Sequence, residues 1–473
     1  MKAESARAGK SPEGRFAAAF GEPGLYALVA GCFLRLFYVI FSTIYDRQYD
    51  IGMIDLDAGH TVTGGHLAYI QYLFENGHLP DFDPTSVYQF NHPPLHHAVS
   101  ALWLKFASLF LKDTAVLEES LQVVPFLCSL LILAVLYRIV RRFSLGKGAV
   151  CFAMALFAFH PALVLLSGSV NNDCMSLLLT LLCVDFCMAW SRRPSAGNIA
   201  KLALAIGLGM MAKQNVAEMA FPIAFVFLYV LVRRWKEGGF ERAKGLIGQF
   251  ALFGALSLPL GLWFYVRNMV LYDMPLVWIY TLPEDSWQYT GNVPVIHRFL
   301  WPVPSEMVDN LLHFKLGCGY NVWMQIVRTS VLGEWDMVDV GRGVKVLAVL
   351  LMLAGAALAA AAFLSFLSVF VLSRGRAGEA EENKGNGILT ADRILFVSAY
   401  FVNLLFYLKF SYDYPQECSM HFRYIEIELL FPAVALSFVW QGCRKRWTKG
   451  VLSALLAVFC ALSAAMIAVW CLG

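Results

Sequence analysis

The sequence predicts an all-α polytopic membrane protein. Of its 473 residues, 59% are hydrophobic and only 15% are charged, and the mean hydropathy is +0.60. A soluble protein carries roughly 25% charged residues. The net charge is only +3, and the basic residues fall in short turns between apolar runs, as membrane topology requires. This distribution excludes a nucleic-acid partner.

Eleven apolar segments are predicted membrane spans, since a span needs about 20 apolar residues. Basic residues gather in the turns that follow the second, fourth, sixth and tenth segments, and the positive-inside rule assigns these turns to the cytoplasm. A single transmembrane domain over residues 1–473 results, with its C-terminus outside. The predicted spans are 24–44, 119–138, 149–166, 174–190, 199–212, 216–232, 246–265, 344–372, 394–410, 424–441 and 451–472.

The N-terminal residues 1–23 are basic and rich in small residues. The apolar run that follows lacks a small-x-small cleavage site and contains Arg35, so we expect a cytoplasmic tail and not a signal peptide. Two long outer loops are then predicted, over 45–118 and 266–343. Most of the polar, aromatic and acidic residues outside the spans fall on this outer face.

The stretch from Asp46 to His97 in the first outer loop holds six of the ten histidines and several carboxylates. Residues 66–76 repeat apolar side chains at helical spacing and are followed by Gly77, which predicts an amphipathic helix lying in the membrane interface. Residues 95–111 are also apolar. A span there would place the basic turn after residue 138 outside, so we expect a second interfacial helix that begins after two prolines.

Carboxylates lie at the outer ends of two predicted spans. Asp50, with Asp55 and Asp57 as alternatives, follows the first span and is placed to act as a general base toward an incoming hydroxyl. Asp173 lies at the mouth of a later span, beside Asn172, and is the second catalytic candidate. The alternatives are a solvated acidic loop for the first group and a helix N-cap for Asp173.

Three cations lie at the same level, at the outer ends of different spans: Lys213, Arg267 and Arg423. Snorkelling accounts for any single one of them. Three together, on the face where positive charge does not normally gather, predict a bound anion at the outer membrane surface. A lipid phosphate or pyrophosphate suits that position.

Arg35 and Asp185 lie inside predicted spans. Charge within a bilayer is costly unless it is paired. We therefore expect these two side chains to form a buried pair, with a structural role rather than a catalytic one.

Other polar residues of the outer face allow more than one interpretation. His92 and His96 would share a helical face and bind a metal, but their spacing is not a zinc signature, so a substrate-loop role together with Asn172 is favoured. A disulfide between Cys318 and Cys418 suits an oxidising compartment. The tryptophans of the second long loop stack on sugar rings or form an interfacial belt; they are Trp278, Trp287, Trp301, Trp323 and Trp335.

These features together resemble the GT-C fold glycosyltransferases. The resemblance is carried by an early span, an acidic outer loop closed by His92-Pro93-Pro94-Leu95, and the Asn172-Asp173 turn. The chain is more closely similar to bacterial relatives of protein O-mannosyltransferases and of the aminoarabinose transferase that modifies lipid A. The segments FYVRN and CSMHFRYI are similar to stretches in bacterial members of that group. The resemblance covers most of the chain and is strongest over residues 45–175.

The resemblance implies an inverting hexosyltransferase of the cell envelope that uses a polyprenyl-phosphate sugar donor. It carries the base to Asp50 and the second-loop acid to Asp173. Many relatives have an Asp-Glu pair in the first loop, whereas this chain has DRQYD and IDLD, so the choice among Asp50, Asp55 and Asp57 stays open.

The implied setting is a multi-pass protein of the bacterial plasma membrane, in contact with membrane lipids and with its active site on the outer face. The acceptor is a protein, a lipid or a cell-wall glycan. Because the leaving phosphate departs as a stable anion, no cofactor is required, and a divalent metal is a less favoured alternative.

A transporter or flippase of an anionic polyprenyl-linked sugar lipid is the main alternative function. Alternating access is typical of chains with inverted repeats and broken helices at the middle of the membrane. No internal repeat is evident here, and the polar residues gather at one face. A receptor or scaffold would not require carboxylates and cations together, so a glycosyltransferase is favoured.

Overall fold

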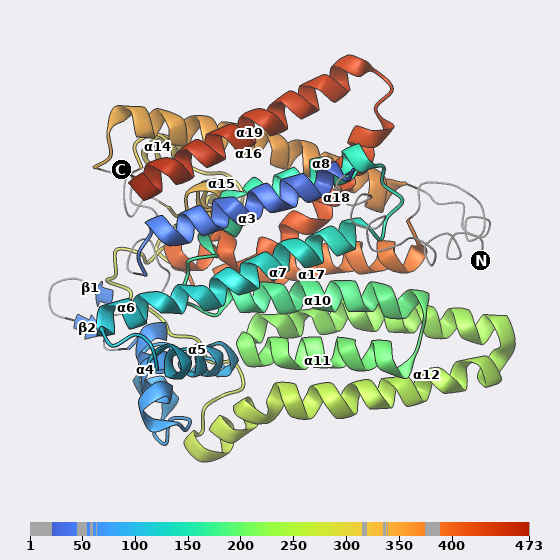
Figure 1. The fold of residues 1–473 in the computed structure, drawn as a ribbon, viewed down its shortest axis with the longest axis horizontal. Coiled ribbons are helices and arrows are strands. Elements are labelled where there is room, and N and C mark those ends of the chain that lie inside the picture. The colour runs from blue at the N-terminus through green and yellow to red at the C-terminus, as the bar shows by residue number, and fades with distance from the viewer. Residues whose placement is uncertain are drawn as a thin grey trace.

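The computed structural model describes residues 21–44, 54–56, 60–62, 64–314, 319–333, 337, 339–373 and 388–472. Its long helices lie side by side along one axis and form a bundle (Figure 1). They are α3 (Pro23–Phe41), α7 (Val123–Val140), α8 (Lys147–Phe159), α10 (Asp173–Arg192), α11 (Ala196–Ala212), α12 (Ala220–Tyr272), α16 (Arg342–Phe366), α17 (Thr390–Asp413), α18 (Leu430–Gly442) and α19 (Arg446–Leu472).

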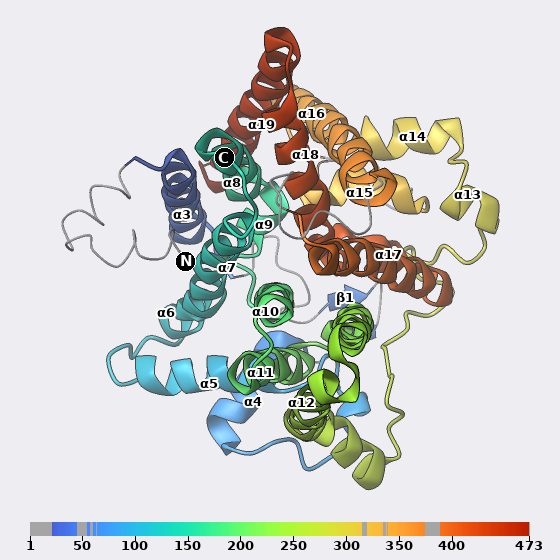
Figure 2. The same cartoon turned by 90° about the vertical axis from the view of Figure 1, so that its right-hand side faces the viewer.

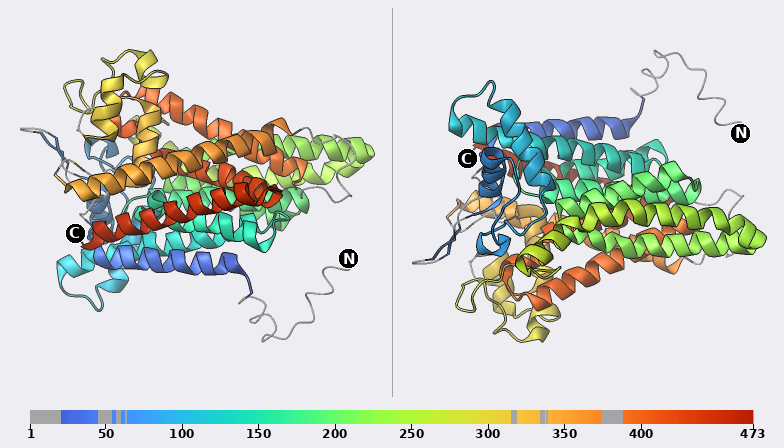
Figure 3. Two further views of the ribbon diagram at one scale, coloured as in Figure 1. Left: turned by 90° about the horizontal axis from the view of Figure 1, so that it is seen from above. Right: turned by 90° about the horizontal axis from the view of Figure 1, so that it is seen from below.

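Short elements gather at one end of the bundle, on the left in Figure 1. Figure 3 shows the same grouping from above and below, with the blue, cyan and yellow segments opposite the turn of α12. These elements include β1 (Ile54–Leu56), β2 (His60–Val62), α4 (His66–Asn76), α5 (Leu95–Ala107), α6 (Thr114–Glu119), α13 (Val295–Phe299) and α14 (Pro304–Leu311).

The remaining elements are short connections, together with the helix α15. They are α9 (Pro161–Leu165), α15 (Val322–Leu332), the 3-10 turns η1 (Pro84–Ser86), η2 (Ser120–Gln122), η3 (Gln214–Met219), η5 (Glu417–Met420), η6 (Phe422–Tyr424) and η7 (Glu426–Leu429), and the π-helical turn η4 (Leu367–Leu372).

Both helices predicted in the first loop are present. α4 has the predicted bounds, and it ends because Gly77 adopts φ +72 and donates its N–H to the carbonyl of Leu73 at 3.0 Å. The apolar face of α4, including Ile70 and Leu73, is buried against Leu104 of α5. This packing fixes the start of α4 beside the start of α5. A position in the membrane interface stays a prediction for both helices.

The protein is an integral membrane protein. Seven helical segments among the described residues are long and apolar enough to cross a membrane. Each of the eleven predicted spans overlaps a helix, and α12 contains two of them because the chain reverses inside it at Gly239 (Figure 1). Gly239 has φ +63, which glycine adopts without steric cost. α8, α11 and α18 have only 13, 17 and 13 residues, so eleven crossings stay a prediction.

The predicted pair between Arg35 and Asp185 is wrong. Arg35 is fully buried and donates to the Ser129 hydroxyl at 2.7 Å and to the carbonyl of Ala158 at 2.8 Å. The helix breaks between α8 and α9, before Pro161, so the last carbonyls of α8 have no helical donor. An unsatisfied carbonyl inside a membrane costs several kcal/mol. Arg35 therefore compensates a broken helix and not a carboxylate.

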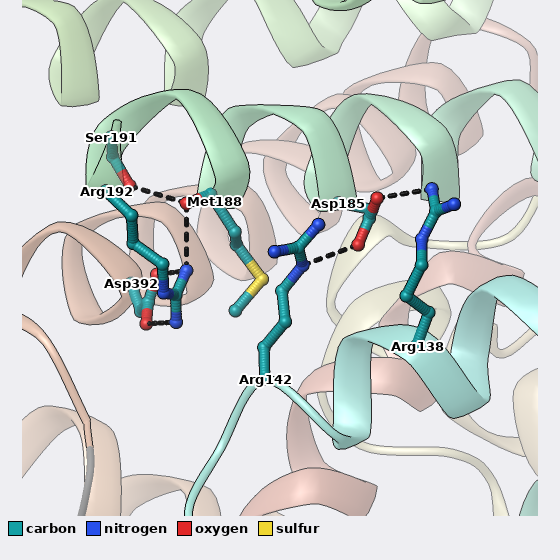
Figure 4. Close-up of polar contacts among 7 residues, drawn as sticks. All are labelled: Arg138, Arg142, Asp185, Met188, Ser191, Arg192 and Asp392. Atoms are coloured by element: carbon teal, nitrogen blue, oxygen red, sulfur yellow. Dashed lines mark hydrogen bonds and ion pairs between the residues drawn. The ribbon is translucent and has the colours of Figure 1, made fainter. Parts of the chain in front are cut away.

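Asp185 instead binds two arginines at the end of α10 that lies away from Asp173 (Figure 4). Its fully buried carboxylate pairs with Arg138 of α7, and it accepts from Arg142 Nε at 2.6 Å. Arg192, two turns further along the same helix, makes a bidentate pair with Asp392 of α17. These ion pairs join α7, α10 and α17 at this end of the bundle.

Candidate active site

A cavity of about 1240 Å³ opens at the end of the bundle that carries the short elements. Its wall comes from several separate segments: the first predicted outer loop, the turn before α10, the α11–α12 junction, the second half of α12 with the loop after it, α15, and the end of α17 with the chain that follows it. These segments include the predicted outer loops 45–118 and 266–343 and the outer ends of predicted spans. Five of the ten candidate site residues line the cavity: His92, Asn172, Asp173, Lys213 and Arg423.

Asp173 and Lys213 form a buried ion pair in this wall. The side chain of Asp173 is 3% exposed and that of Lys213 is 13% exposed. Two asparagines position the pair: Asn171 Oδ1 accepts from the Asp173 N–H at 3.0 Å, and Asn172 Nδ2 donates to the carbonyl of Ala212 at 3.1 Å. The second bond fixes the start of α10 against the end of α11, where Lys213 follows.

The alternative interpretation of Asp173 as a helix N-cap is wrong. Asn172 is the N-cap residue, and Asp173 is the first residue of α10. A carboxylate in the first turn is stabilised by the helix dipole. The side chain of Asp173 is therefore available to hold the cations.

Arg423 completes the charged cluster. Its Nη1 lies 3.8 Å from Asp173 Oδ2, and its Nη2 donates to the Tyr424 hydroxyl at 3.0 Å. Lys213 Nζ and Arg423 Cζ each lie 5.0 Å from the centre of the Tyr424 ring. Cations over an aromatic face are stabilised when water is excluded. Two cations and one carboxylate give this cluster a net charge of +1, which suits an anion.

Arg267, the third predicted phosphate-binding residue, lies elsewhere. Its Nη2 donates to the carbonyl of Pro80 at 2.6 Å, and its Nη1 donates to Asn268 Oδ1 at 2.8 Å. Arg267 is not among the residues that line the cavity. In this conformation it joins the end of α12 to the first outer loop.

Four imidazoles lie beside the charged cluster: His92 and His97 stack on His66, and His96 lies edge-on to His66 and His97. His66 and His92 line the cavity, with ring centres 5.4 Å apart, and His66 Nδ1 lies 2.8 Å from His97 Nε2. Burial, together with His92, His96, Lys213 and Arg423, holds the pKa of His66 well below its ordinary value. Burial lowers the pKa of His96 to about 4. His66 and His96 are therefore neutral at physiological pH.

The metal interpretation of these histidines gains no geometric support. α5 begins at Leu95, so His92 precedes the helix and shares no helical face with His96. Among the residues that the structure describes, no group of three or more His, Cys, Asp or Glu side chains is arranged to hold a metal ion. The expectation that no metal is required stays a prediction.

The three carboxylates predicted as the base have no described side chains. Asp50 and Asp57 lie outside the described residues, and only the backbone of Asp55, in β1, is described. Figure 1 places β1 and β2 beyond the ends of the long helices, and Figure 2 shows β1 in projection among α10, α12 and α17. Gly64 then pairs with Tyr88 of the cavity wall. The hairpin therefore extends from the rim of the cavity.

Gly64 has a conformational reason to be glycine. Its φ is +133, and a Cβ there would lie 2.5 Å from the carbonyl oxygen of Tyr88. The close approach allows Gly65 to donate its N–H to that same carbonyl at 2.9 Å. α4 begins immediately afterwards, so this contact aims His66 at the cavity. The Gly-Gly-His sequence was the available signal for His66, which the sequence analysis did not select.

A second polar group of the wall was also not selected. Glu417 accepts a hydrogen bond from Gln325 Nε2 at 3.0 Å, and both side chains line the cavity with Arg328. Burial raises the pKa of Glu417, and Arg328 and His421 oppose that change. The sequence marked the segment around Glu417 as polar, but it gave no sign that α15 would approach it.

Of the tryptophans and cysteines predicted in the outer loops, some line the cavity and others do not. Trp278 and Trp287 line the cavity, whereas Trp301 and Trp323 are exposed and lie outside its wall. Trp335 and Cys318 lie outside the described residues. The disulfide from Cys318 to Cys418 therefore stays a prediction.

The chain was compared with protein-family models, curated sequences and solved structures. Residues 91–263 match the family model described as dolichyl-phosphate-mannose-protein mannosyltransferase, which is a minority of the chain. No curated protein sequence matches the chain.

Solved structures match over nearly the whole chain. The oligosaccharyltransferase of Archaeoglobus fulgidus in complex with Zn and sulfate has a TM-score of 0.50 at 15% identity, covering 93% of this chain and 53% of that one. The same enzyme tethered with an acceptor peptide containing the NVT sequon has a TM-score of 0.50 at 14% identity, covering 94% and 55%. ArnT from Cupriavidus metallidurans in the apo state has a TM-score of 0.40 at 15% identity, covering 95% and 78%.

The chain thus spans about half the length of the archaeal oligosaccharyltransferase chains that it matches. At this identity the likeness shows the fold. It confirms the predicted all-α GT-C fold and, at the level of the fold, the resemblance to GT-C glycosyltransferases.

Proposed function

We propose that the protein is a membrane glycosyltransferase that moves a sugar, a hexose in our proposal, from a polyprenyl-phosphate-linked donor to an acceptor hydroxyl. The observation that carries the proposal is the pair of cations, Lys213 and Arg423, whose side chains are 13% and 6% exposed, in the wall of a cavity of about 1240 Å³ at one end of a membrane bundle. The family match over residues 91–263, whose description names a dolichyl-phosphate sugar, supports the donor class. The fold of an oligosaccharyltransferase supports the reaction class.

The cations suit the leaving group. When the bond between the sugar C1 and the phosphate oxygen breaks, its electron pair moves to the phosphate, which gains negative charge. Lys213 and Arg423 are positioned to stabilise that charge without reorganisation. Asp173 acts as a positioning residue, because its carboxylate holds both cations at the wall. This arrangement matches a lipid phosphate whose polyprenyl chain stays in the membrane.

A first-loop carboxylate supplies the base. In our proposal Asp50, with Asp55 and Asp57 as alternatives, takes the proton from the acceptor hydroxyl, and the resulting oxygen attacks C1 from the face opposite the phosphate. A single displacement of this kind inverts the anomeric centre. The position of the β1–β2 hairpin beyond the ends of the long helices, with Gly64 bonded to the cavity wall, supports this role. We place the site at the outer face of a bacterial plasma membrane.

The test uses purified protein in lipid nanodiscs with a polyprenyl-phosphate [14C]hexose. Release of polyprenyl phosphate is followed for the wild type and for Lys213→Met and Arg423→Met. Lys201→Met is the matched control, because Lys201 is an exposed lysine near the other end of the same helix, α11. We expect each cavity variant to lower kcat by ~10²-fold or more and the control to equal the wild type. Equal loss in the control and in Lys213→Met would overturn the assignment.

A further inference from the structure

We infer that the cavity contains a built acceptor subsite and that this subsite takes a carbohydrate. The inference rests on the proposed function and names the acceptor class for it. The subsite is formed by Trp287, Gln288, Gln325, Gln416 and Glu417, which all line the cavity. They come from the loop after α12, from α15 and from the chain that follows α17.

Hydrogen bonds hold these three segments together. The Glu417 N–H donates to the carbonyl of Gln288 at 2.8 Å, and Tyr289 pairs with Gln416 in an antiparallel bridge. Gln325 Nε2 donates to Glu417 Oε1 at 3.0 Å. The two loops and α15 are therefore fixed relative to one another without a ligand, so binding loses little conformational entropy.

Glu417 is a buried carboxylate with acceptor capacity left. Its residue is 8% exposed, and the backbone of Gly319 approaches so closely that a Cβ there would lie 2.4 Å from Oε1. The carboxylate accepts from Gln325 and from the backbone of Gly319, and a carboxylate has about four acceptor positions, so positions remain for substrate hydroxyls. Because a buried carboxylate is stabilised by each hydrogen bond that it accepts, a ligand with several hydroxyl donors would be favoured here.

The remaining side chains suit a sugar ring. Trp287 is 46% exposed although it lines the cavity, so its face is available to a ligand. One face of a pyranose is made of C–H groups that pack on an aromatic ring, and its edge carries adjacent hydroxyls. Planar amides such as those of Gln288, Gln325 and Gln416 both donate to and accept from such hydroxyls. The combination of an aromatic face with amides matches both sides of a sugar.

A peptide acceptor suits this wall less well. Extended peptides are commonly bound through main-chain hydrogen bonds to an open strand edge. Here the main chains of the two loops bond to each other: the Thr290 N–H donates to the carbonyl of Pro415 at 2.8 Å, and Glu417 bonds to Gln288. The groups left for recognition are side chains.

The subsite is close to the proposed phosphate site along the chain. Glu417 and Arg423 lie on one short segment, and the Phe422 N–H donates to Thr329 Oγ1 of α15 at 2.8 Å. α15 therefore supports both ends of this segment, at Glu417 and beside Arg423. An acceptor at Glu417 and a donor phosphate at Arg423 would occupy neighbouring parts of one cavity.

The test has two independent measurements on the full-length protein. The first is binding of a short hexose oligosaccharide in the absence of donor, by titration calorimetry. The second is transfer of label from the polyprenyl-phosphate [14C]hexose, in a mixture that holds the oligosaccharide and a Ser- and Thr-rich peptide. We expect the oligosaccharide to bind and to receive the label. Trp287→Ala and Glu417→Gln should each raise its dissociation constant and its KM about ten-fold, with the donor KM changed less than about two-fold.

Matched controls come from the same loop. Trp301→Ala removes a more exposed tryptophan, and Glu284→Gln removes an exposed carboxylate; neither residue lines the cavity. Both should equal the wild type in oligosaccharide binding. Label in the peptide alone, or oligosaccharide binding unchanged by Trp287→Ala, would overturn the carbohydrate subsite. Oligosaccharide binding that depends on Trp287, in a protein that never cleaves the donor, would support the subsite and overturn the proposed function.

Discussion

Two substitutions in the ion pair between Lys213 and Asp173 distinguish its contribution to stability from its contribution to kcat. Lys213→Met leaves the carboxylate of Asp173, which is 3% exposed, with Arg423 at 3.8 Å as its ion pair among the described residues. Removing one partner of a buried pair costs about 3–5 kcal/mol. Because Lys213 is 13% exposed and faces a cavity that admits water, we expect the lower end, about 3 kcal/mol.

The double variant Lys213→Met/Asp173→Asn should recover most of that stability. It removes both charges of the pair, and replacing a buried pair by uncharged groups of similar volume is often neutral in stability. Arg423, which also loses its carboxylate, keeps the hydroxyl and the ring of Tyr424 as partners. Its catalysis should not recover, because the phosphate still lacks one of its two cations. Loss of one such donor lowers kcat by ~10²–10³-fold. Stability and kcat should therefore respond differently to the second substitution.

The assays are thermal unfolding in nanodiscs and release of polyprenyl phosphate from a labelled donor, normalised to folded protein. We expect the single variant to lose both stability and kcat, and the double variant to regain only stability. If the double variant regains wild-type kcat, Lys213 serves only to neutralise Asp173, and its contact with the phosphate is refuted.

Three further predictions test other parts of the account. Asn is substituted singly for Asp50, Asp55 and Asp57. One of the three variants should lower kcat by ~10²–10⁴-fold at unchanged unfolding temperature, and full activity in all three would rule out a base among these residues. Asp185→Asn should lower the unfolding free energy by about 2–3 kcal/mol, because Arg142 and the half-exposed Arg138 lose their carboxylate, while turnover per folded molecule is unchanged. The folded-state pKa of His96, about 4, lies below its ordinary value of 6.5, so its contribution to stability is full above pH 6.5 and falls by up to about 3 kcal/mol as the pH approaches 4. His96→Gln should flatten that part of the curve of unfolding free energy against pH. A curve parallel to that of the wild type would contradict the lowered pKa of His96.

The helices and the grouping of polar residues could be predicted from the sequence more completely than the side-chain pairs that hold the helices together. α4 was predicted with its observed bounds because apolar periodicity and Gly77 act locally. Lys213, Arg423 and Asp173 were expected near one face, because hydropathy orders the spans, and the structure brings them into one cluster.

Pairings within the bundle depend on helix packing that no local pattern reports. Arg35 was expected to bind Asp185, but the break between α8 and α9 created carbonyls that needed a donor, and only the folded arrangement shows them to be nearby. Glu417 was not selected for the same reason. Its partner Gln325 is 92 residues earlier in the chain, and the approach of α15 is a property of the fold.

The central claim is that this cavity cleaves a lipid-linked sugar rather than moving it. The most direct measurement reconstitutes the wild type in sealed vesicles with polyprenyl-phosphate [14C]hexose and acceptor, and follows the label and the lipid together. The account predicts one polyprenyl phosphate released for each hexose transferred, with both lost in Lys213→Met. Intact donor that crosses the bilayer with its sugar still attached would contradict the account and identify a flippase.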